Sequence, residues 1–461
     1  MSFDYLAEQF ATSVDYLAEQ FATLAWGPWL VIFLVGSGIF FLIFSGLRPF
    51  RYLPHAFALL TGKYSKESDV GDVSHFKALT AALSGTIGLG NIAGVAVAIQ
   101  LGGPGAIFWM WLTAIVGIAT KFFTCTLSVM YRDVNPDGTT NAGPMYVIKN
   151  ALPNYMLPLA YFFAIFGIIG CLPGFQSNQL VQISKDLYFP GVENFELIAG
   201  IFLAIITAIV VVGGLKRIAN VASYLVPFMG CIYFGAVLIC IALNIEDFLP
   251  SLSLIISDAF TGSAVASGSI MGVIIVGVRR GAFSNEAGIG TESLVHGSAK
   301  ASHPVKQGLV AMTGPIFDTL IMCTATAVLI LISGVWQNSD AQGVTLTAEA
   351  FNNILGPVGS FVVFLCVLCF GISTIFTYSY YGSSCAKFLF GEKGSQIYTY
   401  IFILMIVIFA VISLDTALNI IDGAFAMMAI PTLVSTLWLA PKVMSSAKEY
   451  FNSLNETAKR T

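Results

Sequence analysis

The stretch Ser84-Gly85-Thr86-Ile87-Gly88-Leu89-Gly90-Asn91 decides the fold. It places three glycines and an asparagine inside residues 78–120, a segment without a charged residue. About 20 apolar residues cross the hydrocarbon core of a bilayer, so this segment holds two spans, hinged at residues 102–105 (GGPG). In lipid, a non-helical backbone is tolerated only where protein shields it or where it lines a cavity. A glycine-rich break inside a span is therefore a candidate binding site.

The composition identifies lipid as the main solvent of the chain. Of the 461 residues, 57% are hydrophobic and only 10% are charged, which no water-soluble globule of this length shows. The net charge is −4, and the absence of a basic arm argues against a nucleic-acid partner. The sequence also lacks a phosphate-binding loop, a metal-ligand cluster and a nucleophile elbow. We therefore expect neither an enzyme nor an ATP-driven pump.

Uncharged stretches of sufficient length predict an all-α membrane protein with about eleven transmembrane helices. Besides the two spans within residues 78–120, we expect spans at residues 24–47, 152–183, 197–215, 219–243, 260–278, 309–335, 358–386, 397–414 and 418–439.

The distribution of charge predicts the orientation of these spans. With the N-terminus outside and the C-terminus in the cytoplasm, the bases between the spans fall on the cytoplasmic side, with Lys185 as the one exception. Lys121, Arg279 and Arg280 are placed in the inner halves of their spans. Acidic residues such as Glu246 populate the opposite side, so the sorting supports the count of eleven.

The second and the seventh span each begin a set of five consecutive spans. Isolated glycine pairs usually serve close helix packing, but this arrangement is expected when a five-helix unit is repeated in inverted topology with its first helix broken. The predicted break of the seventh span centres on Gly272 or on Gly281. The run after Asn285, up to about Lys300, then forms its inner half and part of the inner gate.

The predicted organisation is therefore two repeats with additions at both ends. The repeats cover residues 78–243 and 260–440, after an extra span at 24–47 and before a cytoplasmic tail at 441–461. Residues 1–23 are expected outside the cell. They contain the nonapeptide DYLAEQFAT twice, at residues 4–12 and 15–23. This duplication fits a native feature and a cloning or start-site artefact equally well.

Breaks of this kind offer two sorts of binding group. The N-termini of half-helices present free N–H groups to a carboxylate, whereas unwound carbonyls, hydroxyls and an asparagine amide suit a hard cation such as Na⁺. An amino acid zwitterion needs both an anion site and an acceptor for its ammonium group.

Several motifs make a resemblance specific. Residues 88–91 (GLGN) look like the unwound first helix of the bacterial leucine transporter. The chain more closely resembles the alanine or glycine:cation symporter family, from about residue 25 to the last span, through residues 90–96 (GNIAGVA), 102–111 (GGPGAIFWMW), 141–146 (NAGPMY) and 280–290 (RGAFSNEAGIG). The resemblance implies a leucine-transporter-like fold in a prokaryotic plasma membrane. It also implies sodium-coupled import of alanine or glycine, with D-alanine, serine or glutamine as further substrates.

The resemblance implies roles for residues of the first break. The Thr86 carbonyl and the Asn91 side chain would contact sodium or the substrate amino group, and the Leu89 and Gly90 amides would hold the carboxylate. A second sodium site would join the hydroxyl pair Ser373 and Thr374 to carbonyls near Ser84 and Ile87. The alternative is that such hydroxyls bond back to the i−4 carbonyl of their own helix.

The remaining substrate-binding residues implied by the resemblance are Gln176, Gly277, Gly281 and Phe283. Gln176 belongs to residues 175–178 (FQSN), which resemble a polar substrate-facing turn. The preceding Leu172-Pro173-Gly174 departs from the family pattern, which affects the exact substrate rather than the transport class.

Three acidic residues within or near the spans complete the analysis. A lipid-facing carboxylate costs a few kcal/mol, so Asp318 must face the protein interior, as a gate, a cation-coupling group or a structural acid. Asp415 and Asp422 are expected to be interfacial caps near the outer face. Two alternatives stay open: a proton-coupled carrier in which Asp318 or Glu286 titrates, and a sensor that binds an amino acid without carrying it.

Overall fold

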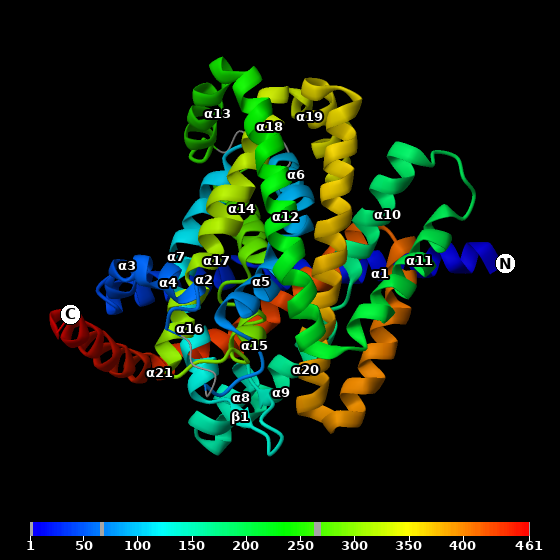
Figure 1. The fold of residues 1–461 in the computed structure, drawn as a ribbon. Helices are drawn as coiled ribbons and strands as arrows, with labels where there is room; N and C mark the ends of the chain where they lie inside the picture. The colour runs from blue at the N-terminus through cyan, green and yellow to red at the C-terminus, as the bar shows by residue number, and fades with distance from the viewer. Residues whose placement is uncertain (1–2, 65–68, 262–268, 461) are drawn as a thin grey trace.

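The computed structural model describes residues 3–64, 69–261 and 269–460. It is almost entirely helical, with one two-stranded antiparallel sheet. The helices α12, α18 and α20 run upright in Figure 1, whereas α1 and α2 run across the view. The N-terminal elements are α1 (Phe3–Ala25), α2 (Pro28–Phe44), α3 (Arg48–Arg51) and α4 (Leu53–Leu60).

The first predicted repeat contains a broken first helix, formed by α5 and α6. Its elements are α5 (His75–Thr86), α6 (Leu89–Gly102), α7 (Ala106–Met130), β1 (Asp133–Val134), β2 (Thr140–Asn141), α8 (Pro144–Ala151), η1 (Asn154–Met156), α9 (Leu157–Gly170), α10 (Gly174–Tyr188), α11 (Phe195–Val211) and α12 (Gly214–Leu243). Helix α13 (Ile245–Asp258) follows it, before the second repeat. The hinge predicted at residues 102–105 is confirmed, because α6 ends and α7 begins there.

The second predicted repeat also begins with a broken helix, formed by α14 and α15. Its elements are α14 (Ile270–Asn285), α15 (Glu292–His296), α16 (Pro304–Ala311), α17 (Thr313–Pro315), the π-helix η2 (Ile316–Cys323), α18 (Thr324–Ser333), η3 (Val335–Gln337), α19 (Val344–Leu355), α20 (Pro357–Val411) and α21 (Leu414–Arg460). A π-helical turn within a span often marks a functional position.

The eleven predicted spans are only partly recovered. Within the described ranges, seven helices are long and apolar enough to cross a membrane, or eight if residues 12–25 and 28–44, bent by 43°, form one span. The count falls because two helices, which meet at a non-helical kink at Gly391 with φ 71°, are counted together as α20, and because α11 is short. Much of the predicted span at 260–278 lies outside the described residues. The extra N-terminal span stays a prediction.

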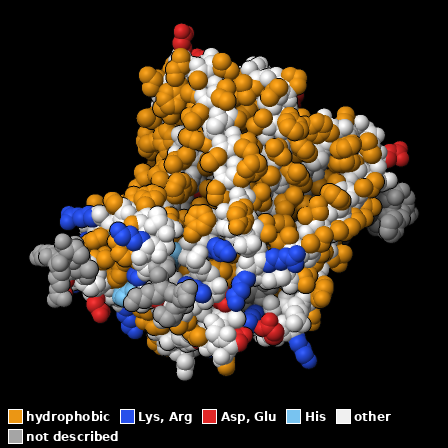
Figure 2. All heavy atoms as spheres, viewed as in Figure 1, with side chains coloured by type: hydrophobic (Ala, Val, Ile, Leu, Met, Phe, Trp, Pro, Cys, Tyr) orange, Lys and Arg blue, Asp and Glu red, His pale blue; other side chains and the backbone are white. Residues whose placement is uncertain are grey.

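The surface matches the distribution of charge in the sequence. Figure 2 shows apolar side chains over the upright helices and Lys and Arg gathered toward the end where α8 and β1 lie. On the face shown, the bases therefore lie mainly to one side of the apolar surface.

Candidate functional site

The first helix break lies where the glycine-rich stretch predicts it. Helix α5 ends at Thr86, Gly88 is extended, and α6 begins at Leu89. The Asn91 Oδ1 atom accepts a hydrogen bond from the Gly88 N–H at 3.0 Å. A Cβ atom on Gly88 would collide with Thr374 Oγ1, so glycine is required there. Because first-turn N–H groups have no intrahelical acceptor, the Leu89 and Gly90 amides are available to an anion.

The second break lies elsewhere than predicted. Helix α14 continues through Gly272 and Gly281 and ends at Asn285, so a break centred on either glycine is wrong. The chain turns instead at Glu286, Gly288 and Gly290, whose φ values are 55°, 85° and 98°. The short α15 follows, and its buried residues form the second half of this broken helix.

Two glycines of α14 serve close packing in this structure. A Cβ atom on Gly277 would collide with the Ala106 carbonyl, and one on Gly281 would lie 3.0 Å from Thr113 Cβ. Both glycines therefore face α7, and their predicted substrate contacts have no support from this packing.

The two breaks adjoin each other. A Cβ atom on Gly90 would lie 3.5 Å from Phe283 Cδ1 and 3.5 Å from the Ser284 Cα atom. The Phe283 ring packs at 88° to the Phe175 ring of α10, with 5.4 Å between centroids. The Arg280 guanidinium lies 5.2 Å from the Phe283 ring centroid. The sequence-predicted Phe283 thus covers the start of α6 from one side.

Asp318 joins both broken helices. It is fully buried in the π-helix η2, which confirms that it faces the interior. Its Oδ1 atom accepts from Asn91 Nδ2 at 2.7 Å, and its Oδ2 atom accepts from Ser284 Oγ at 3.0 Å and from Thr319 Oγ1 at 2.6 Å. One carboxylate therefore connects α6, α14 and η2 through a set of oxygen and amide groups.

The two hydroxyls of the predicted pair on α20 contact different helices. Thr374 Oγ1 lies 2.8 Å from the Ser84 carbonyl, beside the first break, and 2.9 Å from the Phe370 carbonyl of its own helix, which is the expected i−4 alternative. Ser373 instead donates to the Phe370 carbonyl and faces Met229 of α12. Thr377, rather than Ser373, provides the second hydroxyl near Ser84, with its Oγ1 atom 2.5 Å from Ser84 Oγ.

Unsatisfied polar atoms occur in the elements around the two breaks. The following buried atoms have no hydrogen-bond partner among the described residues: Thr86 Oγ1, Gln176 Oε1, Ser177 Oγ, Glu286 Oε1 and Tyr381 Oη. Buried polar groups are normally hydrogen-bonded. Donors and acceptors left open in the interior therefore fit a polar ligand.

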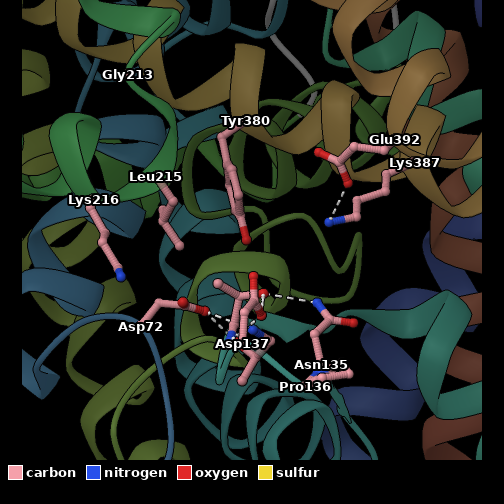
Figure 3. Close-up of a pocket in the computed structure, with 12 residues that line it drawn as sticks. Asp72, Asn135, Pro136, Asp137, Gly213, Leu215, Lys216, Tyr380, Lys387 and Glu392 are labelled. Atoms are coloured by element: carbon pink, nitrogen blue, oxygen red, sulfur yellow. Dashed lines mark hydrogen bonds and ion pairs between the residues drawn. The ribbon is translucent and has the colours of Figure 1, made fainter.

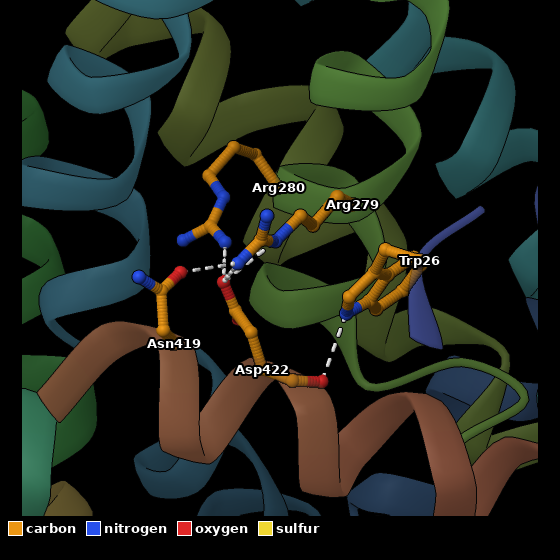
Figure 4. Close-up of polar contacts among 5 residues, drawn as sticks. All are labelled: Trp26, Arg279, Arg280, Asn419 and Asp422. Atoms are coloured by element: carbon orange, nitrogen blue, oxygen red, sulfur yellow. Dashed lines mark hydrogen bonds and ion pairs between the residues drawn. The ribbon is translucent and has the colours of Figure 1, made fainter. Parts of the chain in front are cut away.

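A buried ion cluster lies beside this region, joined to it through the Arg280 guanidinium over the Phe283 ring. Figure 4 shows Arg279 and Arg280 converging on the Asp422 carboxylate, with Asn419 beside them. Asp422 is fully buried and Arg280 nearly so. One prediction is thus wrong: Asp422 is a buried ion-pair partner rather than an interfacial cap. The placement of Arg279 and Arg280 in the inner half of a span stays a prediction.

A cavity of about 500 Å³ reaches this ion cluster from the surface. Its lining includes Arg279, Arg280, Asp415, Asn419 and residues of α1. Asp15 of α1 also contacts Thr416. The second nonapeptide copy therefore forms part of the cavity wall.

A second set of contacts, from the Arg132 side chain to backbone carbonyls, lies at the end of the molecule where β1 is found. Arg132 donates to the carbonyls of Gly297 and Ala299, each at 2.7 Å, and to the Val70 carbonyl at 2.8 Å. The Asp72 N–H donates to the Ser298 carbonyl at 2.8 Å. The segment preceding α5 is thus fastened to the segment following α15.

A larger cavity of about 680 Å³ lies at this second end (Figure 3). It is lined by charges of both signs, among them Asp72, Lys216 and the ion pair of Lys387 with Glu392. Its lining contains no residue of either helix break. The breaks are therefore the better candidate for the binding site.

Sequence reasoning missed three residues of this region: Ser284, Thr377 and Tyr378. The signal for the last two was the i, i+3, i+4, i+7 spacing of Thr374, Thr377, Tyr378 and Tyr381, which places them on one face of a helix. Ser284 gave no such signal, because its role depends on Asp318 of another helix.

Comparisons with known proteins agree on one family. The sequence model of the "Sodium:alanine symporter family" matches residues 11–461, and so includes the second nonapeptide copy. The chain is 40% identical to "Sodium/alanine symporter AgcS" of Methanococcus maripaludis over 93% of this chain and 95% of the relative. It is 32% identical to "Probable sodium/glutamine symporter GlnT" of Bacillus subtilis over 93% and 88%.

A solved structure shows the same fold. The structure described as "MhsT in complex with L-phenylalanine" superposes with a TM-score of 0.56 at 15% identity, covering 81% of this chain and 98% of the other.

Proposed function

Because the chain belongs to the sodium:alanine symporter family, we propose that it imports alanine, glycine or a similarly small neutral amino acid together with Na⁺. The chain is an integral membrane protein and an amino acid symporter; the coupling ion and the substrate are the parts we propose. The observation that carries the proposal is the meeting of two helix breaks around Asp318 and several open polar atoms.

Two groups of oxygen atoms support Na⁺ as the coupling ion. The first contains the Asp318 carboxylate and Ser284 Oγ, with Asn91 Nδ2 donating to the carboxylate. The second contains the Ser84 carbonyl with the hydroxyls of Thr374 and Thr377. Hard cations prefer such oxygen ligands. The chemistry of both groups fits Na⁺, and Na⁺ moving down 100 mV supplies about 2.3 kcal/mol per charge.

The first turn of α6 supports binding of the substrate carboxylate. The Leu89 and Gly90 amides lie at a helix N-terminus, which favours negative charge. Phe283 packs against Gly90 and Phe175 against Phe283. These aromatic rings leave little room beside the break, which favours a small side chain on the substrate.

The two closed ends support alternating access. The Arg280–Asp422 cluster closes one end, and the Arg132 contacts close the other. Transport then requires these contacts to open in turn, with the N-terminus outside the cell and the Arg132 end in the cytoplasm, as the distribution of bases suggests.

The test is uptake of radiolabelled L-alanine into proteoliposomes. An inward Na⁺ gradient is compared with equal K⁺ and H⁺ gradients. Accumulation with Na⁺ alone is expected. Accumulation with H⁺ alone would favour the proton-coupled carrier, whereas binding of alanine, glycine or glutamine without uptake under any gradient would favour the sensor.

Substitutions of the neighbouring hydroxyls test the second group of oxygen atoms. Thr374→Ala is expected to weaken activation of uptake by Na⁺ about tenfold, since one ligand is lost. Ser373→Ala is the matched control and is expected to keep the Na⁺ dependence, because Ser373 faces Met229. The measurement is the Na⁺ concentration at half-maximal uptake. Equal effects of both substitutions would contradict a site at Thr374.

A further inference from the structure

Four ionisable side chains are buried together near the second helix break. They are Lys121 of α7, Glu286, Glu292 of α15 and Asp318, each at most 1% exposed. Lys121 interacts electrostatically with all three carboxyl groups. Three buried carboxyl groups thus interact with a single ammonium group. Because an uncompensated buried charge is costly, this region favours the entry of cations.

Glu286 differs from the other two acids in its hydrogen bonds. Its Oε2 atom accepts from Thr291 Oγ1 at 2.6 Å, but its Oε1 atom has no hydrogen-bond partner among the described residues. Glu292 accepts from Thr124, and both oxygens of Asp318 are occupied. Glu292 also keeps one open oxygen, but it lies within α15. Glu286 lies at the break itself, where its φ of 55° ends α14.

Two tyrosines connect Glu286 to the first break. Tyr378 and Tyr381 both interact electrostatically with the Glu286 carboxyl group. The Tyr378 and Tyr381 rings lie 5.8 Å apart, and Tyr381 Oη lies 3.1 Å from the position of a Cβ atom on Gly85. Tyr381 Oη is itself unsatisfied within the described structure. The two tyrosines therefore extend from Glu286 at the second break to Gly85 beside the first.

We propose that Glu286 Oε1 binds the ammonium group of the transported amino acid. The proposal rests on the proposed function and names a residue that specifies the substrate. The α6 amides take the substrate carboxylate, so its ammonium needs an acceptor on the facing break, which Glu286 supplies. No cluster of three or more His, Cys, Asp or Glu side chains within the described ranges could hold a metal ion.

Glu286→Gln tests the charge while keeping the side-chain volume. The variant is expected to raise the alanine concentration for half-maximal binding about tenfold or more, because a charge-assisted hydrogen bond is lost. Binding of radioactive Na⁺ without amino acid is expected to persist, since Asp318 and Thr374 are intact. Alanine binding close to that of the unsubstituted protein would overturn the proposal.

Thr291→Val separates a binding role from a structural one. It removes the hydrogen bond to Oε2 but leaves the carboxylate charge. Alanine affinity is expected to be largely retained. If Thr291→Val loses as much affinity as Glu286→Gln, Glu286 only holds the break in place, and the proposal fails.

Glu286→Asp gives a second test that does not require the glutamine variant to fold. The shorter carboxylate leaves room for one methyl group beside the ammonium. Competition by sarcosine (N-methylglycine) relative to glycine is therefore expected to rise. An unchanged ratio would overturn the proposal. Failure of the unsubstituted protein to bind any amino acid would instead contradict the proposed function itself.

Discussion

Replacing Asp318 with asparagine is expected to abolish uptake driven by physiological Na⁺ gradients. The variant keeps an oxygen atom but loses the negative charge that faces Asn91 and Ser284. Losing an ionic interaction of about 3 kcal/mol weakens cation binding about 100-fold. The measurement is Na⁺-dependent alanine uptake into proteoliposomes over a wide range of Na⁺ concentrations, together with binding of radioactive Na⁺.

Asp258→Asn is the matched control. Asp258 is also a buried acid, and its Oδ2 atom accepts from the Gly105 N–H at 2.8 Å, at the start of α7. The same substitution there is expected to leave the Na⁺ dependence unchanged. An unaltered half-maximal Na⁺ concentration in Asp318→Asn would exclude Asp318 as a ligand. Loss of H⁺-driven rather than Na⁺-driven uptake would assign it to proton coupling.

Asp422→Ala is expected to cause the largest loss of stability. Two guanidinium groups, Arg279 and Arg280, share this carboxylate, and Arg280 is only 3% exposed. Removing one partner of a buried ion pair costs about 3–5 kcal/mol, because the remaining charge is left uncompensated. Thermal unfolding of the purified protein should therefore begin at a lower temperature. Uptake should also fall, because this cluster closes one end of the pathway.

An exposed ion pair provides the comparison for Asp422→Ala. Asp133 and Lys149 lie 3.0 Å apart, and their side chains are 35% and 47% exposed. Asp133→Ala is expected to cost less than about 1 kcal/mol, as surface pairs usually do. Equal melting temperatures for the two variants would show that the Asp422 cluster contributes no more to the stability of the fold than an exposed ion pair does.

The sequence predicted the first break but not the position of the second. Three glycines around residues 85–90 indicate a break because glycine weakens a helix, and α5 does end at Thr86. In α14, however, Gly272 and Gly281 remain helical, and Glu286 adopts a left-handed conformation. Residues other than glycine rarely adopt this left-handed backbone conformation. A glutamate therefore gave no signal for the break.

The sequence also could not predict which of the two hydroxyls on α20 faces the first break. Ser373 and Thr374 are adjacent, and neighbouring residues on a helix point in directions about 100° apart. Only the rotation of α20 against α5 assigns Thr374 to the Ser84 carbonyl and Ser373 to Met229.

The sequence by itself determined that this chain is a helical membrane protein of one transporter family, because these properties depend on local composition, hydropathy and motif. The tertiary structure decided which side chains share a site. Asp318 meets Asn91 and Ser284, and Asp422 meets Arg280, although these partners are far apart along the chain. Such contacts depend on how helices pack and rotate against one another, which no local pattern encodes.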